Sequence, residues 1–195
     1  MYSSRSERQQ QIIYESIKLI HSQGIQGLTI KNLSKAINVT EAALYRHFKN
    51  KDEILSTILD DFRESLRLYS ASVLESNKSA QEKLRLMIGK LIDVFCENPY
   101  IVSVIFSDEI FKNKIELYSK IGQLMAQNNH CFITIIEEGQ KTNEIRKDLS
   151  AAEISVIVMG SFRLTVKNWQ MSRQSYSLKT KGEAFLLSLI KLIFN

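Results

Sequence analysis

Apolar residues recur three or four positions apart along nearly the whole chain, which is the spacing of one face of an α-helix. Ile13, Ile17 and Ile20 form the first such stripe, and Phe185, Leu189 and Ile193 belong to the last. No segment alternates apolar and polar residues as a half-buried strand does. The 195 residues include one proline and seven glycines, so long helices can run without interruption. The sequence therefore predicts an all-α protein.

Residues that cap helices divide this pattern into about nine helices. Ser6 with Gln9 and Ser150 with Glu153 have the spacing of a capping box, in which two side chains and two backbone N–H groups bond reciprocally. Gly24 is expected to end the first helix, because glycine adopts the left-handed conformation without a steric cost. With their capping residues, the predicted helices cover residues 7–23, 29–37, 40–48, 50–76, 81–96, 101–108, 111–141, 150–171 and 180–193.

Two short helices joined by a tight turn lie between Leu28 and Lys51. Thr29 and Thr40 are suited to cap them, and Asn38 can take the positive φ of the turn between them. A helix-turn-helix of this kind places its second helix in the major groove of DNA. The pattern therefore predicts a DNA-binding unit near the N-terminus.

The second helix of this pair presents side chains that suit a nucleic acid. If Leu44 and Phe48 face the core, then Glu41, Ala42, Tyr45, Arg46 and Lys49 face away from it. The guanidinium fork of Arg46 matches the N7 and O6 acceptors of guanine. Tyr45 and His47 can donate to phosphate oxygens. Lys31 can reach the backbone or a base, and Lys51 lies at a helix start that already favours anions.

The charge of the chain agrees with this prediction but does not establish it. The whole chain holds 26 basic and 21 acidic residues, a net charge of +5, and residues 1–55 hold eight basic and five acidic ones. More than half of the excess therefore lies in just over a quarter of the length. An exposed basic helix is also common in proteins that bind no polyanion, so the charge supports DNA binding only together with the helix pair.

The run Leu44-Tyr45-Arg46-His47-Phe48-Lys49-Asn50-Lys51 resembles the N-terminal domain of the TetR/AcrR family of bacterial transcriptional regulators. The resemblance implies a helix-turn-helix domain of three helices over residues 1–50 and a helical domain for ligand binding and dimerisation over residues 51–195. It departs from the commonest pattern at Asn38, where glycine is usual, and at Ala42, where glycine or proline is frequent. By resemblance, eight residues fall at DNA-contacting positions: Lys31, Thr40, Glu41, Ala42, Tyr45, Arg46, His47 and Lys51.

The same resemblance implies a homodimer that reads a palindromic operator, and one recognition helix indeed covers too few base pairs to be specific. It places the last two helices at the dimer interface, with the candidate residues Ile154, Val158, Phe185, Leu186, Leu189 and Ile190. Their spacing is equally that of residues that line the protomer core. A pocket for a small apolar or amphipathic ligand would draw on Phe95, Phe106, Tyr118, Met125, Phe132, Met159, Phe162 and Arg163. Most of these side chains are also suited to core packing.

Little in the sequence indicates catalysis, a cofactor or a metal. The three histidines have no metal-binding spacing, and Cys96 and Cys131 form no CxxC pair. No glycine-rich phosphate loop or GxSxG occurs. The first residues are polar rather than a signal-peptide core, and no apolar run reaches the roughly 18 residues that span a bilayer, so a cytoplasmic protein is expected.

We therefore expect a dimeric, sequence-specific transcriptional regulator, a repressor that a small ligand releases from DNA. Two alternatives remain open. One is a DNA-binding protein without an inducer, whose C-terminal part docks a protein partner, because residues 41–48 also resemble nucleoid-occlusion members of the family. The other is a helical enzyme or carrier with an incidental basic head.

Overall fold

The structure is a computed structural model that describes residues 5–111 and 114–194. These residues form helices with no named strand, which confirms the predicted all-α class; one isolated bridge joins Ile145 and Phe194. The helices are α1 (Glu7–Gly27), α2 (Ile30–Ala36), α3 (Glu41–Tyr45), α4 (Lys51–Leu74), α5 (Ala80–Glu97), the 3₁₀ turn η1 (Pro99–Ile101), α6 (Val102–Ile105), α7 (Asp108–Phe111), α8 (Ile115–Lys141), α9 (Ala151–Met171) and α10 (Leu178–Ile193).

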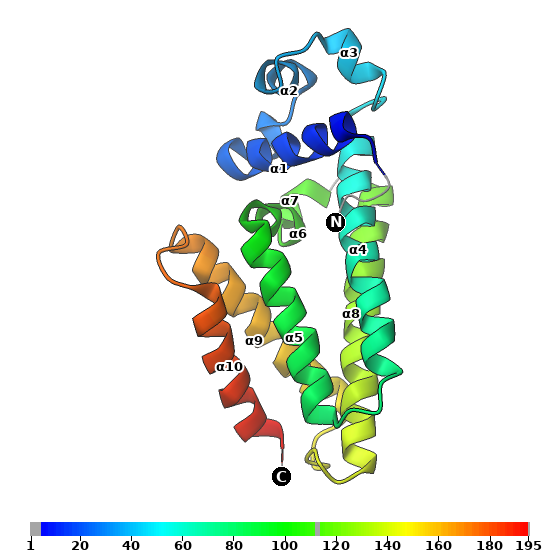
Figure 1. Cartoon of the computed structure of the whole chain (residues 1–195), viewed down its shortest axis with the longest axis vertical. Coiled ribbons are helices and arrows are strands. Elements are labelled where there is room, and N and C mark those ends of the chain that lie inside the picture. Colours follow the sequence, from blue (N-terminus) through cyan, green and yellow to red (C-terminus); the bar gives the residue numbers. More distant parts are fainter. Residues whose placement is uncertain (1–4, 112–113, 195) are drawn as a thin grey trace. The chain divides into compact units, whose positions relative to one another are not determined.

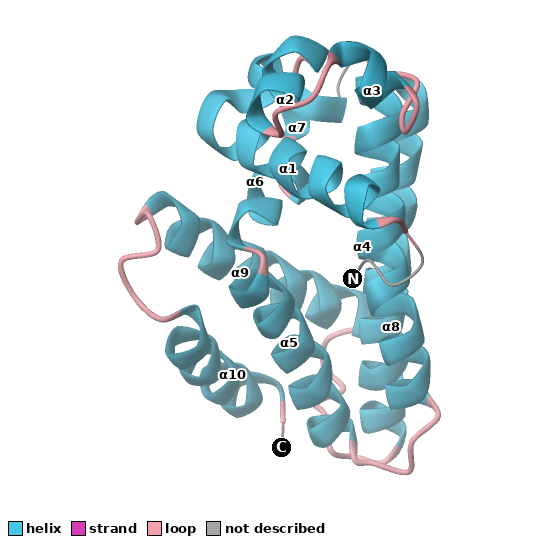
Figure 2. Ribbon diagram, turned by 45° about the horizontal axis from the view of Figure 1, so that its top comes forward, coloured by secondary structure: helices cyan, strands magenta, loops and turns pink. Residues whose placement is uncertain are grey.

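The chain packs into two compact units. The N-terminal unit comprises residues 1–66 and 100–124, and the C-terminal unit comprises residues 67–99 and 125–195. The helices α4 and α8 contribute to both units. In the N-terminal unit α2 lies against α1 and α3, as Figures 1 and 2 show, and in the C-terminal unit α10 packs on α5 and α9. The division at residue 50 that the sequence indicates stays a prediction.

Side-chain caps fix the helix starts where the sequence predicts them. Ser6 with Gln9 and Ser150 with Glu153 both form complete capping boxes. A third box, Ser79 with Glu82, opens α5; it has the same spacing but was not among the predicted boxes. Such caps satisfy N–H groups that the first helical turn leaves without partners.

Several predicted boundaries differ from the structure. Gly24 ends the regular part of the first helix, as predicted, with φ 69° and ψ −177°, and a further helical turn continues to Gly27. The helix predicted over 40–48 ends at Tyr45, and the last helix begins at Leu178 rather than at Thr180. The predicted helix over 101–108 is divided into η1, α6 and α7 because Ser107 starts a new helix, its Oγ accepting the N–H of Ile110 at 3.3 Å. The long helix expected from Phe111 begins at Ile115; residues 112 and 113 lie outside the described residues.

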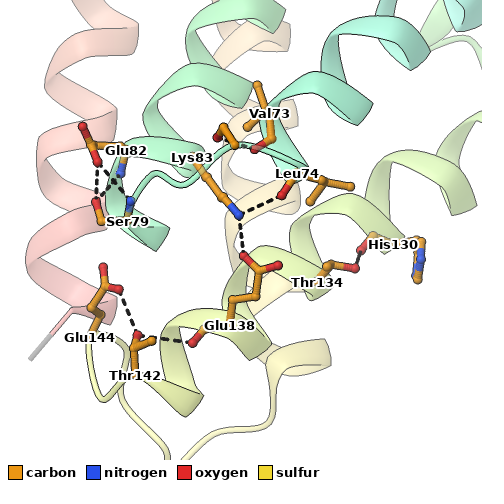
Figure 3. A network of polar contacts seen from close by, with 11 residues as sticks. Val73, Leu74, Ser79, Glu82, Lys83, His130, Thr134, Glu138, Thr142 and Glu144 are labelled. Atoms are coloured by element: carbon orange, nitrogen blue, oxygen red, sulfur yellow. Dashed lines mark hydrogen bonds and ion pairs between the residues drawn. The ribbon is translucent and has the colours of Figure 1, made fainter.

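A charged side chain, that of Lys83, is buried in the C-terminal unit. Lys83 on α5 is 5% exposed, and its Nζ donates to the carbonyl of Leu74, the last residue of α4, at 2.9 Å. The same Nζ donates to Glu138 Oε2 on α8 at 2.7 Å (Figure 3). Lys83 therefore supplies a partner for a helix-end carbonyl and joins three helices through one ammonium group.

Candidate nucleic-acid interface

The two helices α2 and α3 are fixed by caps, by a strained turn residue and by a shared core. The hydroxyl of Thr29 accepts the N–H of Asn32 at 3.0 Å, and that of Thr40 accepts the N–H of Ala43 at 3.2 Å. Asn38 has a φ of 53°, as the sequence predicts. The N–H of Val39 then donates to the carbonyl of Ser34 at 3.0 Å and closes the turn. The relative orientation of the two helices is thus set by local contacts.

Apolar side chains hold α3 against the rest of the N-terminal unit. Leu44 is 2% exposed and Phe48 is 4% exposed, which confirms the predicted inward face. The helix α3 ends at Tyr45, whose side chain is 53% exposed. A further turn follows, in which the N–H of Phe48 donates to the carbonyl of Leu44 at 3.1 Å. The outward face of α3 is therefore free for an external partner.

Most of the residues that the sequence assigned to DNA contact are exposed to solvent. Seven are exposed and His47 is half-buried; the exposed ones are Lys31, Thr40, Glu41, Ala42, Tyr45, Arg46 and Lys51. Lys35 and Lys49 are also exposed on this segment, and both lie outside the predicted set. Lys35 follows Lys31 by four residues, so helical spacing could have placed the two on one face.

The charge of this segment is strongly one-sided. Between Lys31 and Lys51 five side chains are basic and only Glu41 is acidic, and all six are exposed. Exposed cations on one rigid element are the electrostatic requirement for binding a phosphate backbone. We call the exposed side chains from Lys31 to Lys51 on α2, α3 and the start of α4 the basic face.

The loop that leads into α4 is also held in place. The N–H of Glu53 donates to Asn50 Oδ1 at 2.9 Å, and a carboxylate oxygen of Glu53 accepts the N–H of Lys49 at 2.5 Å. The side chain of Asn50 thus caps the start of α4, and the side chain of Glu53 reaches back to the residue before Asn50. These two bonds fix Lys49 and Lys51 on either side of the helix start, where the partial positive charge of α4 adds to theirs.

Arg5 belongs to the basic N-terminal segment but not to the basic face. Its guanidinium group forms hydrogen bonds with both carboxylate oxygens of Asp61, the shortest at 2.6 Å. This contact raises the pKa of Arg5 above its ordinary value, mainly through the hydrogen bond with Asp61. The positive charge of Arg5 is therefore already paired within the protein.

Comparison with known proteins decides the family. The family described as "Bacterial regulatory proteins, tetR family" matches residues 12–58, and the family described as "YsiA-like protein, C-terminal region" matches residues 62–191. The chain belongs to the tetR family of bacterial regulatory proteins. It is thus a DNA-binding transcriptional regulator, and the basic face lies within the first of the two matched regions.

Relatives of this TetR-family regulator cover almost its whole length. It is 26% identical over 188 residues to the fatty acid metabolism regulator protein of Bacillus subtilis (strain 168), a match covering 95% of both chains. It is 22% identical over 178 residues to the nucleoid occlusion factor SlmA of Haemophilus influenzae (strain PittGG), covering 87% of this chain and 81% of SlmA. The structure of FadR from Bacillus subtilis in complex with stearoyl-CoA has a TM-score of 0.74 at 24% identity, covering 93% of this chain and 97% of that one.

The residues that the sequence assigned to a ligand are distributed over both units of this TetR-family protein. Phe95, Phe132 and Phe162 are buried in the C-terminal unit, where the rings of Phe95 and Phe162 lie 6.3 Å apart between centroids. Met125 and Met159 of the same unit are half-buried. The remaining three differ in unit or in exposure: Phe106 is half-buried and Tyr118 is 66% exposed in the N-terminal unit, and Arg163 is exposed in the C-terminal unit.

The residues assigned to the dimer interface lie mostly beneath the protomer surface. Ile154 and Val158 are fully buried, and Leu186 and Leu189 are at most 7% exposed. The other two, Phe185 and Ile190, are half-buried, and the ring of Phe185 lies 6.1 Å from that of Phe162. The large apolar side chains that α9 and α10 leave exposed are Val156, Ile157, Leu164, Met171, Leu187 and Leu192.

No helix within the described residues is both long and apolar enough to cross a lipid bilayer.

Proposed function

We propose that this TetR-family regulator is a dimeric repressor and that each protomer binds one half-site of a palindromic operator through the basic face. The single observation that carries the proposal is the exposed, one-sided charge on a rigid helix pair, five basic residues against one acidic residue. A two-fold pair of such faces reads two half-sites one helical turn apart, about 34–36 Å.

Each residue of the basic face has a role that follows from its chemistry. Lys31, Lys51 and the hydroxyl of Tyr45 contact phosphates, which gives affinity without base preference. Arg46 donates its fork to a guanine. The remaining residues of the set complete the contact: Thr40 at the start of α3, Glu41 opposite a cytosine amino group, the small Ala42 that allows close approach, and His47 beside the backbone.

The proposed dimer interface uses the exposed side of α9 and α10. Val156 and Leu164 are more than 60% exposed, and Leu187 and Leu192 are 52% exposed, which is much apolar surface for two neighbouring helices. On the same two helices Ile154, Val158, Leu186 and Leu189 are buried within the protomer, and Phe185 and Ile190 are half-buried. Burial of the exposed side against a second copy supports a stable dimer, since large apolar patches mark interfaces.

We propose an amphipathic effector with a long acyl chain, such as a fatty acyl-CoA thioester. The relative named as a fatty acid regulator and the neighbour with bound stearoyl-CoA support this class. The apolar interior of the C-terminal unit around Phe95, Phe132 and Phe162 suits an acyl chain. An exposed cation such as Arg163 suits the anionic part.

Release from DNA follows if the effector binds one conformation more tightly than another. A ligand shifts a two-state equilibrium only by its difference in affinity for the two states, and about 5.5 kcal/mol of difference moves a population from 1:99 to 99:1. In this proposal the effector occupies the C-terminal unit. The change reaches the N-terminal unit through α4 and α8, which contribute to both units.

One experiment tests the operator and the effector separately. Genomic fragments of the source bacterium are selected on the purified protein, and the enriched sequence is used in fluorescence anisotropy with stearoyl-CoA, coenzyme A or stearate added. We expect nanomolar binding of a palindrome by a dimer, and release by stearoyl-CoA but not by coenzyme A. Equal binding of random DNA would refute the operator proposal, and unchanged binding with every acyl compound would refute the effector.

The relative named as a nucleoid occlusion factor supports a second candidate, a DNA-binding protein that docks a protein partner and needs no effector. Specific DNA binding that no acyl-CoA alters would favour it. A helical enzyme or carrier gains no support from these relatives, which are named for regulation or nucleoid occlusion. Action on DNA implies that the protein works in the cytoplasm.

A further inference from the structure

The start of α1 is attached to the side of α4 by a two-point ion pair. Arg5 Nε lies 2.9 and 3.0 Å from the two carboxylate oxygens of Asp61, and Arg5 Nη2 lies 2.6 Å from Oδ1. The side chain of Asp61 is only 11% exposed and that of Arg5 is 26% exposed. The carbonyl of Arg5 also accepts the side-chain amide of Gln10 at 3.0 Å. A bidentate arginine–carboxylate pair fixes both distance and orientation.

The residue before Asp61 attaches α4 to α8. Asp60 Oδ2 lies 2.5 Å from the Nζ of Lys120, and Asp60 Oδ1 lies 3.5 Å from Arg63. Arg63 in turn donates to the side chain of Gln123 at 3.4 Å. Since consecutive helical residues point about 100° apart, two neighbouring carboxylates serve two different elements. One turn of α4 thus holds the start of α1 on one side and α8 on another.

The other half of α1 has its own polar anchor. His21 Nδ1 lies 2.9 Å from Ser103 Oγ on α6, and the His21 ring lies 4.8 Å from that of Tyr100 between centroids. Sixteen residues separate Arg5 from His21, or about 24 Å along a helix. If α1 turns about His21 by 5°, its start moves by about 2 Å. An anchor at Arg5 therefore controls the angle of α1. The helix α2 packs on α1, and α3 packs on α2, so both follow α1.

We propose that Asp61 is a positioning residue for DNA binding, which through Arg5 holds α1, and with it the basic face, at the angle that fits DNA. This inference rests on the proposed function. It predicts a change in DNA affinity opposite to the change that net charge alone would cause. Loss of Asp61 raises the net charge by one and frees Arg5, so a protein that gained affinity only from charge would bind DNA more tightly. If Asp61 positions the basic face, its loss weakens binding.

The central variant is Asp61→Asn, with Glu7→Gln as its matched control. Glu7 is exposed in the first turn of α1, and its replacement changes the net charge by the same amount in the same unit. We expect Asp61→Asn to weaken operator binding about tenfold, by fluorescence anisotropy at fixed salt, and Glu7→Gln to leave it unchanged or slightly tighter. The slope of log affinity against log salt stays the same, because Asp61 itself contacts no phosphate.

Three further variants separate positioning from folding. Arg5→Gln and the double variant Arg5→Gln with Asp61→Asn should each show the same loss as Asp61→Asn, because the three remove one shared interaction. The exchanged pair, Arg5→Asp with Asp61→Arg, should recover most of the affinity. Recovery of DNA affinity without a matching change in melting temperature is expected for positioning and not for a general loss of stability.

The outcomes are distinct. If Asp61→Asn binds DNA as tightly as the unaltered protein or more tightly, the inference is wrong. It is also wrong if affinity and melting temperature fall together in every variant and the exchanged pair restores neither. If the unaltered protein itself shows no preference for any DNA sequence, the proposed function fails first, whatever Asp61 does.

Discussion

The ammonium nitrogen of Lys83 lies 2.7 Å from Oε2 of Glu138, although only 6% of the lysine side chain and 42% of the glutamate side chain are exposed. The two partners are therefore unequal. If Lys83 is removed, Glu138 can turn toward water. If Glu138 is removed, the ammonium group stays buried and still donates to the Leu74 carbonyl, but it has lost its ion-pair partner.

This asymmetry predicts that Glu138→Ala destabilises the protein more than Lys83→Met. A buried charge without its partner costs about 3 kcal/mol or more, whereas the carbonyl that Lys83→Met leaves unpaired costs about 1–3 kcal/mol. The double variant, Lys83→Met with Glu138→Ala, should be about as stable as Lys83→Met alone. Urea unfolding followed by circular dichroism measures all three. A lower midpoint for Lys83→Met than for Glu138→Ala would contradict the argument.

Lys51 and Arg46 should affect DNA binding in different ways. Lys51→Ala is expected to weaken binding to all sequences and to reduce the salt slope by about one, because one phosphate contact is lost. Arg46→Ala should relax the preference at one base pair of each half-site, at a cost of about 1–3 kcal/mol for the cognate base. Binding-site selection with each variant separates the two. A changed base preference in Lys51→Ala would argue against its assignment to phosphate.

Asn38 carries a conformational cost that its replacements should reveal. Its backbone has a φ of 53°, which asparagine tolerates because its side chain can hydrogen-bond locally. Alanine has no such side chain, so Asn38→Ala should destabilise the protein by about 1 kcal/mol. Asn38→Gly should be neutral or stabilising, because glycine takes positive φ freely. Thermal unfolding compares the two variants. Equal melting temperatures for alanine and glycine would show that the turn does not depend on this backbone conformation.

The capping boxes should make stability depend on acid. Hydrogen bonds from Ser79 lower the pKa of Glu82, and hydrogen bonds from Ser150 lower the pKa of Glu153. A carboxylate whose pKa is lower in the folded state contributes stability above its ordinary pKa, about 4.3, and loses it as the pH falls through the folded value. We expect the urea midpoint to fall below pH 4.5, and to fall less in Glu82→Gln with Glu153→Gln. An identical pH profile in that double variant would refute this cause.

How far the sequence predicts the site depends on whether an interaction is local. Thr29, Asn38 and Thr40 contact groups only a few residues away, so their roles follow from residue type and spacing. Arg5 and Asp61 are 56 residues apart, so no local pattern in the sequence pairs them. The basic face could thus be predicted, whereas the contact proposed to orient it could not.

The same reasoning explains the apolar positions of the C-terminal unit. The spacing of Ile154 and Val158 fits both a core and a dimer interface, because α9 carries apolar residues on more than one side. Only packing against the other helices decides which side is covered. The exposed Val156 and Leu164 are as apolar as their buried neighbours, so their exposure could not be read from periodicity.

The sequence by itself determined the helical class, most helix starts and the basic face, since helix caps, turn residues and apolar spacing act over three or four residues. The tertiary structure alone decided that Lys83 is buried beside Glu138, that Arg5 is held by Asp61, and which apolar side of α9 stays exposed. These contacts depend on which surfaces meet when distant segments pack together. Local residue spacing does not specify which surfaces those are.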